Sequence, residues 1–351
     1  MHCKSSLVDD YSCPTCRKSY PLLDGSLPIL VTDPAWYLTD HITGTQTILT
    51  RAERALAMVA ELLATGHRRE AALRRMREGM SVNVELVRRW HAALTACSPA
   101  TTQFASNLRR NGDGVTANIG ALRYIINDWG HGAENEEVIA QLVEILRRQL
   151  AGRDLSSVAV LGGGAGRLAW ELSRDCDAVH IFDVSAALAL TYSWLRAEPI
   201  VVHQPIEMNA RTIEDLYPAV RLTSEVPERD RAARPERVDY VIGDVLRMPV
   251  ADASITAAVA VYLTDVVASI PALLAELARV LVPGGAFVNF GTLGYSDFKP
   301  GEMWTASELR DVLAEHGFRI EHEDWVPHRL WPSSALVQLQ ATAWSFVAVK
   351  V

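Results

Sequence analysis

The residues most suited to chemistry are glycines and acids at the ends of apolar runs. Four glycines follow the apolar run 158–161, namely Gly162, Gly163, Gly164 and Gly166. A second apolar run ends on Asp183, and a third ends on Gly243-Asp244. Glycines at a strand-to-helix turn let the backbone approach a ligand closely, and an acid closing the next strand can bind both hydroxyls of a ribose. The pattern predicts a site for a nucleoside-containing cofactor.

Three features favour S-adenosylmethionine over a dinucleotide. The glycine spacing is G-x-G-x-G, which lacks the last glycine of the dinucleotide fingerprint. Asp244 stands where an acid can accept from an adenine amino group. A predicted turn, Pro283-Gly-Gly, precedes another apolar run. A turn of this sequence before a strand resembles the pattern of class I methyltransferases. The alternatives are an NAD-dependent enzyme and a fold of this type without catalysis.

The expected cofactor contacts come from this glycine turn, from the helix after it and from the ends of the strands. They are Gly162, Gly164, Gly166, Arg167, Asp183, Asp244, Val245 and Val261. Arg167 opens the helix after the turn, where it either approaches the methionine carboxylate or covers the sheet edge.

The composition limits the class of partner. The chain has 351 residues, 49% of them hydrophobic, and a net charge of −8. This net negative charge argues against nucleic-acid binding through phosphate contacts, although it does not exclude a local basic patch. The sequence contains no apolar run long enough for a membrane span and no signal peptide at its start, so we expect a cytoplasmic protein.

The elements that position these residues predict an α/β fold in three parts. A Rossmann-like methyltransferase sheet with helices on both faces is expected over residues 115–351. Helical periodicity predicts a helical cap or linker over residues 41–114, in which the arginines of residues 68–77 lie on a solvated face or on a patch for an anionic partner. Residues 1–40 form a small separate module.

This module resembles the small zinc-ribbon domain that activates several methyltransferases. Cys13-Pro-Thr-Cys16 is a C-x-x-C knuckle, whose thiolates can share one zinc ion. Cys3 is the expected third ligand, with His2 or an outside group as the fourth. Such ribbons have two C-x-x-C pairs, so the alternative is a relic without metal.

The larger part of the chain resembles the carnosine N-methyltransferase family, which methylates a ring nitrogen of histidine imidazole in small peptides. The resemblance covers residues 115–350 and rests on five segments: Ile126-Asn-Asp-Trp129, Gly162–Glu171, Gly243-Asp244, Tyr262-Leu-Thr-Asp265, and Pro283–Tyr295. The chain departs from the family pattern at Asn127, Thr292 and Ser296, where the family has arginine, proline and histidine.

The resemblance implies that Asp265 is the acid facing the acceptor, and that Tyr295 helps to close the acceptor site. A carboxylate that accepts from one imidazole N–H fixes the tautomer and stabilises the methylated cation. The alternative for Asp265 is a helix N-cap. Asn289 and Trp331 are further expected substrate contacts, with strand packing as the alternative for Asn289. Trp325, His328 and Trp331 belong to an aromatic-rich segment that either lines the substrate entrance or forms a hairpin at the sheet edge.

The predicted function is therefore an S-adenosylmethionine-dependent methyltransferase acting on a histidine-like imidazole of a small molecule or peptide. The cofactors are S-adenosylmethionine and one structural zinc. An RNA base methyltransferase with a zinc ribbon is the first alternative, although no Asn-Pro-Pro-Tyr-type motif follows the fourth strand. A non-catalytic partner subunit with the same fold is the second.

Overall fold

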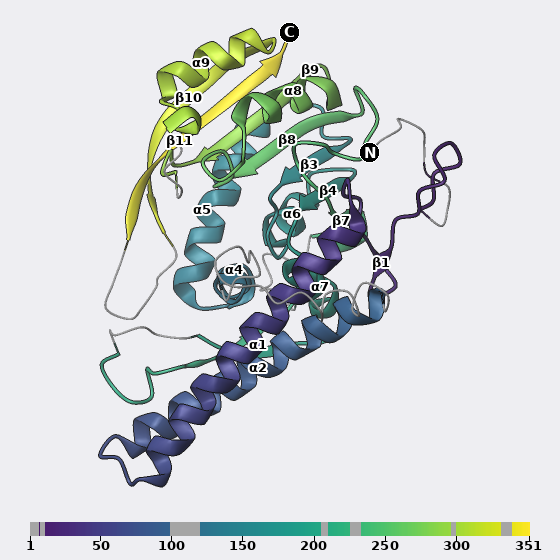
Figure 1. The fold of residues 1–351 in the computed structure, drawn as a ribbon. Coiled ribbons are helices and arrows are strands. Elements are labelled where there is room, and N and C mark those ends of the chain that lie inside the picture. The colour runs from purple at the N-terminus through teal and green to yellow at the C-terminus, as the bar shows by residue number, and fades with distance from the viewer. Residues whose placement is uncertain are drawn as a thin grey trace.

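A seven-stranded sheet forms the centre of the protein (Figure 1). The computed structural model describes residue 7 and residues 11–98, 120–204, 210–224, 233–295, 300–330 and 339–351. The sheet has the order β10-β11-β9-β8-β3-β4-β7, and β11 is antiparallel to both of its neighbours. Its strands are β3 (Val158–Leu161), β4 (Val179–Asp183), β7 (Val238–Ile242), β8 (Ile255–Val261), β9 (Leu281–Gly291), β10 (Phe318–Arg329) and β11 (Gln340–Lys350). The predicted Rossmann-like α/β fold is confirmed.

Helices cover both faces of this sheet because the strands are apolar on both sides. Val158 and Val160 of β3 pack into one core and Ala159 and Leu161 into the other. The first core takes side chains from α4 (Gly120–Trp129), α5 (Ala133–Leu150), α6 (Arg167–Leu172) and α7 (Ala186–Leu195). The second takes them from α8 (Ile270–Val280) and α9 (Ala306–Glu315).

The order of the strands indicates where a ligand crevice lies in the sheet. β3 pairs with β4 on one side and with β8 on the other, and all three strands are parallel. In open α/β sheets, ligands bind outside the carboxyl ends of the strands at such a change of direction. The glycine turn and the segment after β8 both lie at this edge.

The predicted turn at Pro283-Gly-Gly lies within β9. Pairing with β8 moves from Ile255–Leu281 to Ala257–Ala286, so the chain turns at Pro283-Gly-Gly before regular pairing resumes, within the bounds of β9. The extra residues are accommodated because Gly284 adopts a positive φ of 78°.

Two long helices precede the sheet. α1 (Pro34–Ala64) and α2 (Glu70–Cys97) pack side by side as a hairpin whose far end stands away from the sheet (Figure 1). α1 starts where Asp33 accepts from the Trp36 N–H, so the helix crosses the boundary expected between residues 40 and 41. A short hairpin, β5 (Ile200–His203) with β6 (Ala219–Leu222), lies against α2.

The N-terminal segment joins the edge of the sheet. It contains β1 (Leu22–Leu23) and β2 (Leu27–Pro28), and its Leu23 and Ile29 are fully buried in the central core. Ile29 forms a parallel bridge to Ile242 of β7, and the Leu30 N–H donates to the Ile242 carbonyl at 2.8 Å. Within the described ranges, no helix is both long and apolar enough to cross a membrane.

Candidate functional site

The glycine turn between β3 and α6 is held by two carboxylates. The Gly164 N–H donates to Asp183 Oδ2 at 3.0 Å, and the next amide, Ala165 N–H, donates to Asp128 Oδ2 at 2.8 Å. Asp183 closes β4 as predicted, and its Oδ1 accepts from the Ser185 N–H at 2.8 Å. Two consecutive amides of the turn therefore point at acids of the protein itself.

The last two residues of α4 bind the backbone N–H and the backbone carbonyl of one residue, Ala165. Asp128 accepts from the Ala165 N–H, and the Trp129 indole N–H donates to the Ala165 carbonyl at 2.7 Å. The prediction named neither residue as a site residue, although the segment Ile126-Asn-Asp-Trp129 was one of the five that carried the family resemblance. That motif was the available signal.

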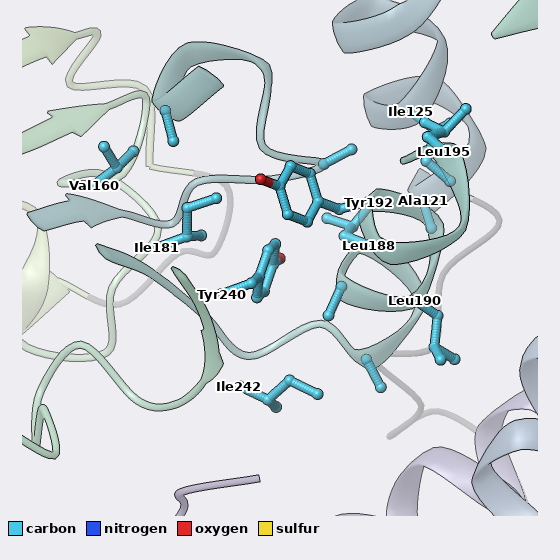
Figure 2. Close-up of a cluster of buried hydrophobic side chains, with 14 of the residues drawn as sticks. Ala121, Ile125, Val160, Ile181, Leu188, Leu190, Tyr192, Leu195, Tyr240 and Ile242 are labelled. Atoms are coloured by element: carbon cyan, nitrogen blue, oxygen red, sulfur yellow. The ribbon is translucent and has the colours of Figure 1, made fainter. Parts of the chain in front are cut away.

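A tyrosine from the sheet completes this support. The Tyr240 hydroxyl of β7 donates to the Gly164 carbonyl at 2.7 Å. Its ring lies 5.5 Å from that of Tyr192 on α7, and both rings sit among the aliphatic side chains of the core (Figure 2). The turn is thus rigidly placed before any ligand binds.

Burial changes the acidity of both carboxyls. Desolvation raises the pKa of Asp128 to about 7, against the effects of the Ala165 amide and of Arg167. Desolvation also raises the pKa of Asp183 to about 6, although three backbone amides act in the other direction. Both groups therefore have proton equilibria close to neutral pH.

The first glycine of the turn, Gly162, lies close to Leu263 in the segment after β8. Gly162 has a φ of 60°, and a Cβ placed on it would lie 2.7 Å from Leu263 Cδ1. Only glycine lets the turn approach Leu263 this closely. Gly164 also has a φ of 60°, and Gly166 caps α6 with a left-handed backbone.

The expected adenosine contacts flank an open apolar surface. Val184, directly after Asp183, is 53% exposed, which is unusual for a valine beside a core strand. Asp244 follows β7, is half-buried, and its Oδ1 accepts from the Leu246 N–H at 2.9 Å. Val245 is buried in the second core, and Val261 ends β8. Among these, the side chains of Val184 and Asp244 are accessible to solvent, and the expected adenosine contacts stay a prediction.

Arg167 lies inside the protein and is not exposed beside the glycine turn. Its side chain is fully buried, donating to Glu171 Oε1 at 3.0 Å and to both oxygens of Glu136 at 3.2 and 3.3 Å. Glu136 also contacts His131. The expected roles were an approach to the methionine carboxylate and cover of the sheet edge; in the structure the ion pair between Arg167 and Glu136 ties α6 to α5.

Asp265 lies after β8 on the acceptor side of the crevice. It is 8% exposed, and its Oδ2 accepts from the Thr292 hydroxyl at 2.8 Å and from the Gly294 N–H at 3.1 Å. The alternative role as a helix N-cap is excluded, because Ser269 caps α8 by accepting from the Ala272 N–H. Asp265 therefore binds the segment after β9.

Asn289 and Tyr295 support this region from inside the protein. Asn289 is 1% exposed, donates to the Trp344 carbonyl at 3.0 Å and accepts from the Thr264 hydroxyl at 3.3 Å. The half-buried Tyr295 donates to the Trp304 carbonyl at 2.9 Å. These contacts agree with the packing alternative for Asn289.

The aromatic-rich segment belongs to a hairpin at the sheet edge, which was the alternative expectation. Trp325 and His328 are in β10, which pairs along its length with β11. Trp325 stacks on Trp344 at 6.1 Å, and His328 is buried 5.2 Å from the Phe290 ring. Trp331 lies outside the described residues.

The C-x-x-C knuckle has one buried and one exposed thiol. The Cys16 N–H points at Cys13 Sγ from 3.4 Å. Cys3 lies outside the described residues, and across the described ranges no three histidines, cysteines or acids are grouped to hold a metal ion. Two of the three expected ligands are thus placed side by side.

Comparison with known proteins agrees with the fold. Residues 212–289, from before β7 into β9, match the family model described as a methyltransferase domain. No curated protein matches the sequence.

Several solved structures are similar to the chain. A SAM-dependent methyltransferase from Aquifex aeolicus is 14% identical with a TM-score of 0.43, over 67% of this chain and 100% of that chain. The [4+2]-cyclase SpnF is 14% identical with a TM-score of 0.44, over 66% and 94%. Geranyl diphosphate C-methyltransferase from Streptomyces coelicolor, solved with S-adenosyl-L-homocysteine, is 15% identical with a TM-score of 0.40, over 63% and 85%.

These scores are low, so the assignment depends on the strand order, the site and the matched domain. On those grounds the chain contains a methyltransferase domain with a Rossmann-like sheet.

Proposed function

We propose that the protein transfers the methyl group of S-adenosylmethionine to an imidazole nitrogen of a small molecule or peptide. The observation that carries the cofactor part is the pair of carboxylates on the glycine turn. In a dinucleotide fold, free amides at this place bind the pyrophosphate. Here Asp183 and Asp128 already accept from the Gly164 and Ala165 amides.

A turn lined by two acids repels phosphate and attracts cations. S-adenosylmethionine has a sulfonium and an ammonium group and no phosphate, so its charge complements Asp128 and Asp183. Ribose hydroxyls can donate to Asp183, which retains acceptor capacity beyond its two backbone donors. The NAD-dependent alternative has no such complementarity.

The acceptor part of the proposal rests on Asp265. The bound cofactor supplies an electrophilic methyl group, and the new N–C bond forms as the C–S bond breaks and sulfur keeps the electron pair. A neutral imidazole nitrogen attacks with its own lone pair and becomes cationic. Asp265 accepts from the other ring N–H, which orients the ring and stabilises the developing charge.

Asp265 also favours this class of acceptor over an anion. The carboxylate already receives two donors on Oδ2. An acid at the acceptor site disfavours carboxylate or phosphate nucleophiles and can accept from a group with an N–H. The acidic chain and this acid both argue against RNA as the substrate.

Zinc at the N-terminus is a separate part of the proposal. The Cys16 backbone lies against Cys13 Sγ, and Cys3 is the expected third ligand. The ion would stabilise the segment that joins β7 at the sheet edge.

The test uses methyl-labelled cofactor with three kinds of acceptor: histidine, β-alanyl-histidine and unmodified RNA. Label on an imidazole nitrogen supports the proposal. Label found on RNA alone would refute the imidazole acceptor and support the cofactor part of the proposal. No binding of S-adenosylhomocysteine in calorimetry would overturn the cofactor site itself.

A further inference from the structure

The carboxylate of Asp265 is held on one side only. The Thr292 hydroxyl and the Gly294 N–H both donate to Oδ2, at 2.8 and 3.1 Å. Among the described residues, no donor contacts Oδ1. One oxygen is thus fixed by the protein and the other is left for a ligand.

The sheet determines where Thr292 stands. β9 ends at Gly291, one residue before Thr292, and pairs with β8 through Phe290 and Val261. The two strands therefore deliver Thr292 and the segment leading to Asp265 to the same edge. Thr264, beside Asp265, is fixed to β9 through Asn289.

We propose that Thr292 is a positioning residue that orients Asp265, so that Oδ1 faces the acceptor N–H. This inference rests on the proposed function and specifies how the acid of that site is prepared. A hydroxyl that donates to a carboxylate stabilises its charged form and restricts its rotation.

Two other titratable groups face the same carboxylate. Tyr262, at the end of β8, and Tyr295, after β9, both have raised pKa values, chiefly through desolvation and secondly or later through the charge of Asp265. Both phenols stay neutral near pH 7.

The first experiment measures the carboxyl NMR signal of Asp265 in the absence of an acceptor. The full-length protein is labelled with ¹³C at aspartate carboxyls, the Asp265 signal is identified by its loss in Asp265→Asn, and its chemical shift is compared between variants at one pH. Thr292→Val removes the hydroxyl at nearly constant volume and should move the Asp265 carboxyl signal, because a hydrogen bond to Oδ2 is lost. Thr292→Ser keeps the hydroxyl and should give the wild-type signal.

Thr50→Val is the matched control. Thr50 donates to the Gln46 carbonyl within α1, and the substitution removes one hydroxyl of the same kind outside the site. If Thr292→Val does not fold, Thr292→Ala makes the same test with a smaller side chain.

The second experiment measures turnover of β-alanyl-histidine against pH. Thr292→Val should lower kcat about tenfold near neutral pH and move the acid limb of the profile upward, with little change in the KM for the cofactor. Thr292→Ser should restore both.

Two results would overturn the inference: an unchanged Asp265 carboxyl signal in Thr292→Val, or equal changes of that signal in Thr292→Val and Thr292→Ser. A wild-type enzyme that methylates no imidazole would instead refute the proposed acceptor, and the carboxyl signal would still decide the role of Thr292.

Discussion

Asp128 and Asp183 accept from neighbouring amides of one glycine turn, although 55 positions separate them in the sequence. Asp183 binds the Gly164 N–H at 3.0 Å, and Asp128 binds the Ala165 N–H at 2.8 Å. Free amides at this position would suit an anion. Because the protein supplies its own anions here, the site is complementary to a cationic cofactor.

The binding of the cofactor should therefore depend on pH. The pKa values of Asp128 and Asp183 in the free protein are raised, to about 7 and about 6. A cationic ligand favours the ionised acids, so S-adenosylmethionine should bind more tightly as pH rises through 6 to 7, up to about tenfold per pH unit for one linked proton. Calorimetry in buffers with different ionisation enthalpies should detect proton release in this window.

The stability of the unliganded protein should change in the opposite direction. An acid whose pKa is raised by folding contributes stability that is complete below its ordinary pKa and is lost as pH rises through the raised value. Asp128→Asn keeps an acceptor for the Ala165 amide and should flatten both the binding and the stability profiles near pH 7. Identical profiles in wild type and variant would show that Asp128 does not titrate there.

The ribose anchor can be tested by Asp183→Ala. Loss of a charge-assisted hydrogen bond costs about 1.5–3 kcal/mol, so the Kd for S-adenosylhomocysteine should rise roughly 10- to 150-fold. Gly164→Val should also weaken binding, because Gly164 has a φ of 60° and a Cβ there lies 3.3 Å from Asp128 Oδ2. Asp177→Ala, at a side chain that is 79% exposed, is the control. Unchanged affinity in both site variants would contradict this assignment of the turn.

The N-terminal knuckle can be tested by metal content. Elemental analysis of protein purified without chelator should find about one zinc per chain, and Cys13→Ser/Cys16→Ser should lose it. Metal-free wild-type protein with the same melting temperature as the double variant would mean that the segment is held by buried residues such as Leu23 and Ile29 alone.

The role of Asp265 can be tested by Asp265→Asn. The amide can still occupy the place beside Thr292, but it has no charge to stabilise a methylated imidazole. Turnover should fall about 10²-fold, equivalent to roughly 2.7 kcal/mol, while cofactor affinity stays the same. Normal turnover would eliminate Asp265 as the acceptor-orienting acid.

The sequence was sufficient to predict the strands that form the centre of the sheet. Apolar runs ending in Gly162, Asp183 and Asp244 indicated three parallel strands and the edge at which they meet, because parallel strands buried on both faces are apolar throughout. The same reasoning placed Asp265 at that edge. These predictions depended on local patterns, which a sequence displays directly.

The contacts that fix the site could not be predicted in the same way. Asp128 and Trp129 reach the glycine turn across more than 35 positions, and Arg167 binds Glu136 across 31. Such pairs follow from how α4 and α5 pack on the sheet. The sequence left two roles open for Arg167 and two for Asp265. The structure excludes the N-cap role of Asp265, because Ser269 caps α8, and the ligand-binding roles of both residues stay predictions.

The central claim is that a cationic methyl donor bound at the acid-lined turn transfers its methyl group to an imidazole nitrogen. The most direct measurement is transfer of labelled methyl from S-adenosylmethionine to β-alanyl-histidine, with the product identified by mass and by the position of the label. The account predicts a product labelled on a ring nitrogen, formed by wild type and reduced about 10²-fold in Asp265→Asn. Labelled RNA with unlabelled imidazole, or no transfer by a protein that binds the cofactor, would contradict it.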